Sequence, residues 1–290
     1  MSERKRANRA AITGMAIRTQ GLVHIYHAEG HDVAALSGVD LDVRPGELMG
    51  LLGPSGSGKS TLMSLLAGVF RPSAGKIFVG DHEVSSAGPK ELDRLRATEV
   101  SLMLQGAGRN LLPYATPAAN VAFAQRSAGR TKELPAPDEV LSELGIADMA
   151  ERPLASLTPG ELQLVALAVA LANRPGLVLA DEPTSQLGHE ARDLVLERLT
   201  WINRTHGTTV VLVTHDPHVA AFLPRTVTIR DGRIGGEGRS GEEYAVVTAD
   251  GFLPLPGHVR DVLPPGTLVR FHPVDGHYEL VPGHEVATDE

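Results

Sequence analysis

The chain has 290 residues, 42% of them hydrophobic, so it is long and apolar enough to bury the core of one large domain or two. Its 27 basic and 35 acidic residues give a net charge of −8, which disfavours a general nucleic-acid binder. The absence of cysteine excludes disulfides, thiolate metal sites and a cysteine nucleophile, and fits a reducing compartment. The longest apolar stretch, around residues 164–172, is much shorter than a membrane span, and we expect no direct membrane insertion.

The first predicted elements follow a tail at residues 1–15. Alternating apolar and polar residues predict two antiparallel strands at residues 17–26 and 36–43. An apolar run at residues 48–52 predicts a strand buried on both faces, followed by a glycine-rich loop and a helix over residues 59–67. Further strands are predicted at residues 76–79, 100–104, 177–180 and 209–213, with helical patterns between them. This alternation is typical of an α/β fold with a parallel sheet.

Two segments depart from that alternation. Residues 106–173 have only helical patterns, interrupted by a polar, proline-containing stretch at 129–137, so we expect a helical subdomain there. A linker-like sequence at residues 235–241 predicts a domain boundary near residue 238. Short strands predicted at residues 244–248, 252–255, 268–272 and 278–281 then indicate a small β-rich domain over residues 239–290.

A glycine-rich loop carries the strongest functional signal. Residues 53–61 contain the pattern G-x-x-x-x-G-K-S between a predicted strand and a predicted helix. Its small residues let backbone N–H groups surround a phosphate, and the helix N-terminus adds a partial positive charge. Lys59 can reach the β and γ phosphates, and the Ser60 hydroxyl can ligate Mg²⁺. The sequence therefore predicts a nucleoside triphosphate site formed by Gly53, Pro54, Ser55, Gly56, Ser57, Gly58, Lys59, Ser60 and Thr61.

Two carboxylates end the predicted strand at residues 177–180. The carboxyl ends of parallel strands face the ligand crevice, so we expect Asp181 to hold Mg²⁺ through water and Glu182 to orient or deprotonate the attacking water. Taken alone, the pair could equally begin a turn before Pro183. The phosphate loop in the same chain favours the catalytic interpretation.

The order and spacing of these motifs, from about residue 17 to 234, resemble those of ATP-binding cassette (ABC) ATPases. The phosphate loop resembles their Walker A motif, and residues 177–182 resemble Walker B. The resemblance makes Gln105 the Q-loop glutamine at the metal and catalytic site, His215 the switch histidine and Tyr26 the aromatic residue that stacks on adenine. It implies a P-loop NTPase domain over residues 16–238, with a RecA-like parallel sheet, an antiparallel β subdomain and a helical subdomain.

Within this family the lipoprotein-release and macrolide-exporter type is most similar, through residues 35–41, 110–113 and 180–184. This resemblance implies an ATPase subunit that binds ATP and Mg²⁺ and energises a separate membrane permease. The subunit would be cytoplasmic, peripheral on the inner face of the cell membrane. Two such subunits, as a homodimer or as a heterodimer with another ABC ATPase, would sandwich two ATPs; no nucleic-acid partner is expected.

The family signature, Leu-Ser-Gly-Gly-Gln/Glu, reads Leu-Thr-Pro-Gly-Glu at residues 157–161. By resemblance, Thr158 and Gly160 contact the ATP of the second subunit. Pro159 removes a backbone N–H, although Thr158 and Glu161 predict a capping box at a helix start, which could still face a γ-phosphate. The alternative is a helix start that no longer contacts ATP.

Two more positions depart from the family pattern. Leu164 replaces an arginine that follows the signature, and Gly188 replaces an aspartate that helps couple the two sites. All these changes affect the half of the site offered to the partner, so we predict slow or asymmetric hydrolysis, with a dependence on a partner subunit.

The C-terminal segment resembles the swapped-hairpin β domains of bacterial transition-state regulators (AbrB-like), through residues 250–256, 266–271 and 276–280. Such domains dimerise and many bind DNA, but residues 244–290 carry two arginines and seven acids, which favours dimerisation or regulation. The alternative for this segment is a solvated β appendage without such a role. For the whole chain, the alternatives are a soluble non-transport ABC ATPase and a nucleotide-gated regulatory module with little hydrolysis.

Overall fold

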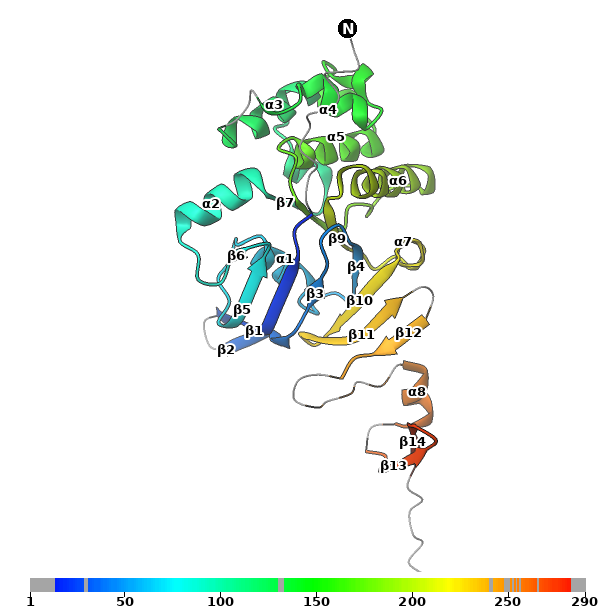
Figure 1. Ribbon diagram of the computed structural model, residues 1–290. Helices are drawn as coiled ribbons and strands as arrows, with labels where there is room; N and C mark the ends of the chain where they lie inside the picture. Colours follow the sequence, from blue (N-terminus) through cyan, green and yellow to red (C-terminus); the bar gives the residue numbers. More distant parts are fainter. Residues whose placement is uncertain are drawn as a thin grey trace, which may run out of the picture.

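The computed structural model describes residues 14–28, 31–129, 133–239, 242–247, 251, 253, 255, 257–264 and 266–282. Residues 1–13 of the predicted tail and most of residues 248–256, including much of the strand predicted at 252–255, therefore lie outside the described residues. The predicted end of the tail at residue 15 is wrong, because Met15 is buried in the core and its N–H donates a hydrogen bond to Gly176 O. The elements form two sheets with surrounding helices, and a separate hairpin at the C-terminal end (Figure 1).

The first sheet is antiparallel and has the order β2-β1-β5-β6, with β3 paired to β1. It consists of β1 (Ile17–Ala28), β2 (His31–Val39), β3 (Asp42–Val43), β5 (Ala74–Val79) and β6 (His82–Glu83). The strand predicted at residues 36–43 is divided, because β2 ends at Val39 and β3 begins at Asp42. The prediction that residues 76–79 join the parallel sheet is wrong: β5 pairs antiparallel with β1, in a register that joins Ile17 to Val79.

The second sheet has the order β12-β11-β10-β4-β9-β8-β7, and its parallel part is the predicted α/β core. Its strands are β4 (Leu48–Leu52), β7 (Val100–Met103), β8 (Leu177–Asp181), β9 (Thr209–Val213), β10 (Arg225–Arg230), β11 (Arg233–Arg239) and β12 (Glu242–Ala245). The central strands β4, β8 and β9 are almost fully buried, because each is an apolar run with neighbours on both sides. The segment predicted as a linker at residues 235–241 is strand in its described part, so this sheet continues past residue 238 to Ala245.

Helices cover the parallel sheet and form a separate layer at one end of the molecule, where α3, α4 and α5 group together (Figure 1). The helices are α1 (Lys59–Leu66), α2 (Pro89–Thr98), α3 (Pro117–Ser127), α4 (Pro137–Glu143), α5 (Pro159–Leu171), α6 (His189–His206), α7 (Pro217–Phe222) and α8 (Gly257–Val262), with 3-10 turns at Ala107–Asn110, Ala147–Met149 and Leu154–Ser156. The described part of residues 106–173 is thus helical, as the sequence predicts.

Two apolar cores hold these layers together. One joins the antiparallel sheet to α1 and one face of the parallel sheet, with Leu62 and Leu66 among its fully buried residues. The other joins α5 and α6 to the opposite face and includes Leu167 and Leu199. The apolar ends of the parallel strands are therefore fixed on both sides, which holds the loops at their carboxyl ends in place.

The C-terminal segment contains the predicted strands as β13 (Val269–Val274) and β14 (His277–Pro282), joined by a turn at Asp275 and Gly276. The helix α8, which the sequence analysis did not predict, precedes them. This hairpin lies at the end of the molecule opposite the helical layer (Figure 1).

Candidate nucleotide site

The phosphate loop connects β4 to α1, as its sequence predicts. Lys59 is the first residue of α1, and its Nζ donates hydrogen bonds to the carbonyl oxygens of Gly53 and Pro54 at 2.9 and 2.7 Å. Gly58 has a φ of 103°, and a Cβ at this position would lie 2.4 Å from the carbonyl oxygen of Ala35. Only glycine satisfies both constraints, so the loop conformation is encoded locally.

Two side chains in the loop fit a bound phosphate. The Ser57 hydroxyl is buried and has no hydrogen-bond partner among the described residues. Burial lowers the pKa of Lys59, and the charges of Glu182 and Asp181 oppose this effect. A phosphate would accept a hydrogen bond from the Ser57 hydroxyl and would stabilise the charged form of Lys59. The loop itself supplies neither an acceptor for Ser57 nor a negative charge for Lys59.

Asp181 ends β8, directly beside the phosphate loop in the sheet crevice. Burial raises the pKa of Asp181, and a hydrogen bond from Ser60 opposes the rise. A divalent cation would stabilise the ionised carboxylate, and a hydroxyl with a carboxylate is an oxygen donor set that suits Mg²⁺. The described residues contain no cluster of three His, Asp or Glu side chains, and the predicted third ligand, Gln105, hydrogen-bonds Glu182 through its Nε2.

Glu182 is held between two residues from different strand ends. Gln105 Nε2 donates a hydrogen bond of 2.9 Å to Glu182 Oε2, and His215 Nδ1 lies 2.9 Å from Glu182 Oε1. Glu182 has a φ of 46°, an unfavourable conformation for a residue with a side chain. Its amide N–H donates to Val213 O, which ties this strained turn to the end of β9. The structure thus brings Gln105, Glu182 and His215 together around one carboxylate.

Tyr26 lies at the edge of the phosphate-loop helix. Its hydroxyl is 3.2 Å from Thr61 Oγ1, and its ring makes edge contacts with His24 and Phe70. The ring is 41% exposed, so one surface stays open to a flat, apolar group. This position beside α1 is compatible with the predicted adenine contact.

The altered signature begins α5, and the predicted capping box is confirmed. Thr158 Oγ1 accepts a hydrogen bond from the Glu161 N–H, and Glu161 Oε2 accepts one from the Thr158 N–H. Pro159 occupies the first helical position, where it contributes no N–H. Among the described residues, none accepts a hydrogen bond from the Gly160 N–H, so this group and the Thr158 O–H are the donors that the helix start can offer.

Gly188 lies at the start of α6, where it is the N-cap and supplies no side-chain hydrogen bond. A Cβ at this position would meet no atom within 4 Å. A cavity of about 490 Å³ is lined by Gln105, Glu182 and His215 together with the residues that precede Gly188, Ser185 to Leu187. Gly188 therefore lacks the carboxylate of the family's aspartate, although there is space for a side chain at this position.

Sequence reasoning missed the residues that fix the loop after Gln105. The Asn110 side chain donates to the carbonyl oxygens of Leu104 and Gly106 and accepts from the Leu104 N–H, all within 3.0 Å. Arg109, the residue before this clamp, lies on the surface. Its positive charge is one of those that oppose the burial-driven rise in the pKa of Asp181. A lone arginine in a Gly-Ala-Gly-Arg-Asn stretch gave no signal of this arrangement.

A phosphate loop at the end of a buried parallel strand, with a second strand ending in Asp181 and Glu182, defines a P-loop ATPase with an added helical subdomain. A profile of the family described as "ABC transporter" matches residues 36–185. The chain is 37% identical over 222 residues to the lipoprotein-releasing system ATP-binding protein LolD 1 of Caulobacter vibrioides, covering 75% of this chain and 94% of that protein.

A second relative is the macrolide export ATP-binding/permease protein MacB of Rhodopirellula baltica, 36% identical over 227 residues, which are 77% of this chain and 33% of MacB. Among solved structures, the dimeric ABC transporter cassette MJ0796 superposes with a TM-score of 0.70 at 30% identity, covering 77% of this chain and 98% of the cassette. The same cassette in a dimeric post-hydrolysis state with ADP and Pi gives 0.66 at 28% identity.

The chain therefore belongs to the ABC transporter family, and the predicted similarity to its lipoprotein-release and macrolide-exporter type is confirmed. Its fold is the ATP-binding cassette, and the activity of this family is ATP binding and hydrolysis.

Proposed function

We propose that this chain is the ATPase subunit that drives a separate membrane permease of the lipoprotein-release or macrolide-export type. The observation that carries the proposal is the carboxylate of Glu182, held by Gln105 and His215 beside a complete phosphate loop. The names of the relatives support the permease partner, because LolD 1 is part of a lipoprotein-releasing system and MacB combines an ATP-binding part with a permease.

In this proposal the phosphate loop binds the triphosphate of ATP through its backbone N–H groups, Ser57 and Lys59. Mg²⁺, held by Ser60 and Asp181 with Gln105 nearby, would supply positive charge to the phosphates when bound. Glu182 accepts a proton from the attacking water, and His215 orients the Glu182 carboxylate. Tyr26 stacks on the adenine.

The second ATP contact comes from another subunit. Thr158 and Gly160 stand at the exposed start of a 13-residue helix, whose N-terminus favours an anion. The dimeric structures of the related cassette support a dimer for this chain, either a homodimer or a heterodimer with another ABC ATPase. Pro159 leaves fewer donors than the family signature, which favours slow hydrolysis in a homodimer.

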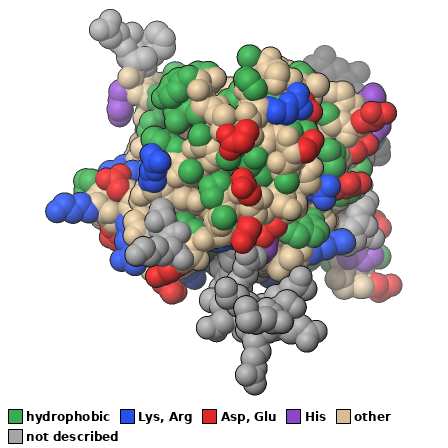
Figure 2. Space-filling model, turned by 90° about the horizontal axis from the view of Figure 1, so that it is seen from above, with side chains coloured by type: hydrophobic (Ala, Val, Ile, Leu, Met, Phe, Trp, Pro, Cys, Tyr) green, Lys and Arg blue, Asp and Glu red, His purple; other side chains and the backbone are tan. Residues whose placement is uncertain are grey.

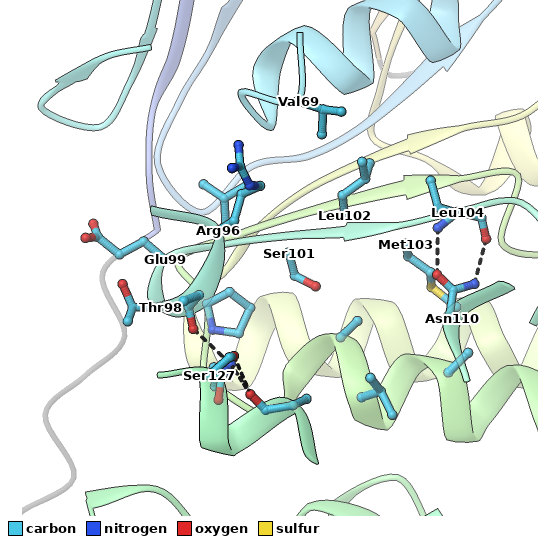
Figure 3. A pocket seen from close by; sticks show the side chains of 18 of the residues that line it. Val69, Arg96, Thr98, Glu99, Ser101, Leu102, Met103, Leu104, Asn110 and Ser127 are labelled. Carbon is cyan, nitrogen blue, oxygen red and sulfur yellow. Dashed lines mark hydrogen bonds between the residues drawn. The ribbon is translucent and has the colours of Figure 1, made fainter. Parts of the chain in front are cut away.

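The permease would contact a groove between the cassette core and the helical layer. This groove has a volume of about 380 Å³ and runs along the edge strand β7 and beneath α5. Figure 3 shows Arg96, Thr98 and Glu99 at one end of the groove and the Asn110 clamp beside Met103 at the other, with Ser101 and Leu102 between them. The clamp binds the backbone on either side of Gln105, so a segment seated here could shift the residue that hydrogen-bonds Glu182.

The outer face of the helical layer is a mixed surface. Figure 2 views the molecule from that end and shows apolar side chains among scattered acidic ones. Tyr114 and Phe123 of this layer are 85% and 57% exposed. No helix in the described part of the chain is both long and apolar enough to cross a bilayer. We propose that the subunit lies in the cytoplasm, on the inner face of the cell membrane, held there by its permease; the permease part named in MacB supports this.

The test is ATP turnover by the purified chain, with and without reconstituted permease, compared with Glu182→Gln. We expect turnover above the variant level, further stimulation by the permease, and equal ATP affinity of the two chains. A chain that binds ATP but turns over no faster than Glu182→Gln, even with a permease, would instead be a nucleotide-gated regulatory module. Purification without any membrane protein, at full activity, would favour a soluble ATPase.

A further inference from the structure

Tyr26 belongs to a cluster of three rings beside the phosphate-loop helix. Its ring meets the imidazole of His24 edge to face, with ring centroids 4.7 Å apart and planes at 87°. The imidazole in turn stacks on Phe70, with centroids 6.1 Å apart and planes at 14°. Tyr26 and Phe70 also meet edge to face, at 6.3 Å. All three distances are typical of interacting aromatic pairs, and we call these residues the aromatic cluster.

The three rings differ in exposure. His24 is only 9% exposed, whereas Phe70 is 43% exposed and Tyr26 keeps a similar open surface. The Nδ1 atom of His24 is buried and has no hydrogen-bond partner among the described residues. His24 therefore acts on its two aromatic neighbours through the packing of its ring.

The strand pairing is irregular at His24. The register of β1 with β2 shifts between His24 and Ile25, where it skips Ala35. The carbonyl oxygen of Ala35 lies against the phosphate loop, because it is the atom that a Cβ at Gly58 would approach. A bulge bends a strand and redirects its side chains. The same irregularity therefore borders both the aromatic cluster and the phosphate loop.

The loop that carries Phe70 is tied to β1 on both sides of His24. The Ser73 N–H donates a hydrogen bond of 2.9 Å to Val23 O. The Ile25 N–H donates one of 3.0 Å to Ser73 Oγ. These two bonds keep the loop beside β1, so Phe70 stays stacked on His24.

The hydroxyl end of Tyr26 is held by the phosphate-loop helix. Tyr26 Oη is 3.2 Å from Thr61 Oγ1, in the first turn of α1. The side chain thus has a support at its hydroxyl and a second support along its ring. A half-exposed tyrosine without such neighbours can adopt several rotamers, and fixing one of them in advance removes this cost from ligand binding.

We propose that His24 and Phe70 are positioning residues, which hold the Tyr26 ring in the orientation that stacks on the base of ATP. This inference rests on the proposed function, in which Tyr26 contacts adenine. It assigns the affinity for the base to the whole aromatic cluster rather than to one tyrosine. A triphosphate without a base would bind through the phosphate loop alone and would not depend on the cluster.

The first test compares the binding of ATP with that of inorganic tripolyphosphate, which has no base. In calorimetric titrations, His24→Ala should weaken ATP binding about three- to tenfold, the value of an aromatic contact, and should leave tripolyphosphate binding unchanged. His27→Ala is the matched control, because this histidine of β1 is exposed and pairs with Asp32, and it should change neither affinity. Unchanged ATP affinity in His24→Ala would overturn the proposal.

A second variant avoids substitution of a buried residue. Phe70→Ala removes a half-exposed ring, so the fold should tolerate it, and tripolyphosphate binding reports whether the phosphate loop is intact. We expect a loss of ATP affinity of about two- to fivefold, with tripolyphosphate binding unchanged. Equal losses for the two ligands would show a general effect on the loop and would contradict a role in base binding.

A double-mutant cycle shows whether His24 acts through Tyr26. In the Tyr26→Ala chain the ring to be held is absent, so adding His24→Ala should weaken ATP binding by less than about twofold further. Losses that multiply as if the two residues were independent would overturn the proposal.

The Tyr26→Ala chain also separates this inference from the proposed function. We expect all three alanine variants to lose part of the preference for ATP over tripolyphosphate, and Tyr26→Ala to lose the most. If Tyr26→Ala keeps the full preference, the adenine contact of the proposed function fails, and the inference fails with it. If Tyr26→Ala loses the preference while His24→Ala and Phe70→Ala keep it, only the inference fails.

Discussion

The two halves of the nucleotide site differ in how completely they are built. The phosphate-loop half consists of residues 53–61 with Gln105, Asp181, Glu182 and His215, and its parts are joined by short hydrogen bonds. The signature half consists of residues 158–161 and Gly188; it keeps a capped helix start but lacks an N–H and a carboxylate. In the proposed function, the phosphate-loop half acts on its own ATP, whereas the signature half offers fewer contacts to the ATP of a partner.

The difference shows that a sequence can keep the local fold of a site while it loses some of the groups that contact the ligand. The capping box of Thr158 and Glu161 stabilises α5 whether or not the helix contacts a phosphate. Glu182, by contrast, adopts a left-handed φ of 46°, and the catalytic role that we propose for it would account for this strain.

The largest effect is expected at Glu182. Glu182→Gln removes the proton acceptor but keeps a hydrogen-bonding side chain, so turnover should fall by about 100- to 1000-fold with ATP affinity retained. Phosphate release and equilibrium nucleotide binding measure the two quantities. Glu190→Gln, at an exposed position in the first turn of α6, is the matched control and should change neither.

The next largest effect is expected in the phosphate loop. Gly58→Ala places a Cβ 2.4 Å from the Ala35 carbonyl oxygen, so the loop must shift and ATP affinity should fall about 100-fold. Gly56→Ala is the control, because its φ of 78° is also left-handed but its Cβ meets no atom within 4 Å. Similar losses in both variants would show that backbone strain, rather than the close approach at Gly58, controls the loop.

A third prediction concerns the junction of α4 with the C-terminal ends of α5 and α6. Glu143 of α4 contacts Arg174 after α5 and His206 at the end of α6. Burial opposes ionisation of Glu143, but hydrogen bonds from His206 and Arg174 outweigh it and lower its pKa to about 2. This pKa is below the usual 4.5, so the stabilisation is fully present above pH 4.5 and is lost as the pH falls through 2.

Glu143→Gln should therefore lower the free energy of unfolding at pH 7 by about 2 kcal/mol, less than the full shift implies because the carboxylate is partly exposed. Urea unfolding of both chains measures this difference, which should shrink as the pH is lowered below 4.5. A difference independent of pH would mean that the ion pair does not hold the junction.

The smallest effect is expected from repair of the signature half. Pro159→Gly restores an N–H, and Gly188→Asp restores a carboxylate that can also cap α6. Together they should raise homodimer turnover about three- to tenfold, roughly the net value of one ordinary hydrogen bond. Unchanged turnover in the double variant would show that the signature half does not limit the reaction.

The phosphate loop and the capping box were predictable from the sequence because each depends on residues that are close together in the chain. The phosphate loop needs glycine at specific positions, and the capping box needs Thr158 three residues before Glu161. The positions of Gln105 and His215 beside Glu182 followed from family resemblance, since neither residue is distinctive alone.

Pairing was harder to predict than strand formation. The pattern at residues 76–79 indicates a strand but not its partner, and β5 joins β1 rather than the parallel sheet. The glycines at residues 235–238 are typical of a linker, yet β10 offers an unpaired edge that β11 occupies. The Asn110 clamp was invisible because it depends on the conformation of Gly106.

The central claim is that a complete phosphate-loop half faces a weakened signature half. It is tested most directly by mixing the wild-type chain with a chain that carries three substitutions. Pro159→Gly and Gly188→Asp repair the signature half of this second chain, and Glu182→Gln removes its proton acceptor. Mixed dimers should hydrolyse ATP faster, per wild-type chain, than wild-type homodimers. No increase on mixing, or wild-type turnover already near the roughly 10 s⁻¹ typical of enzymes, would contradict the claim.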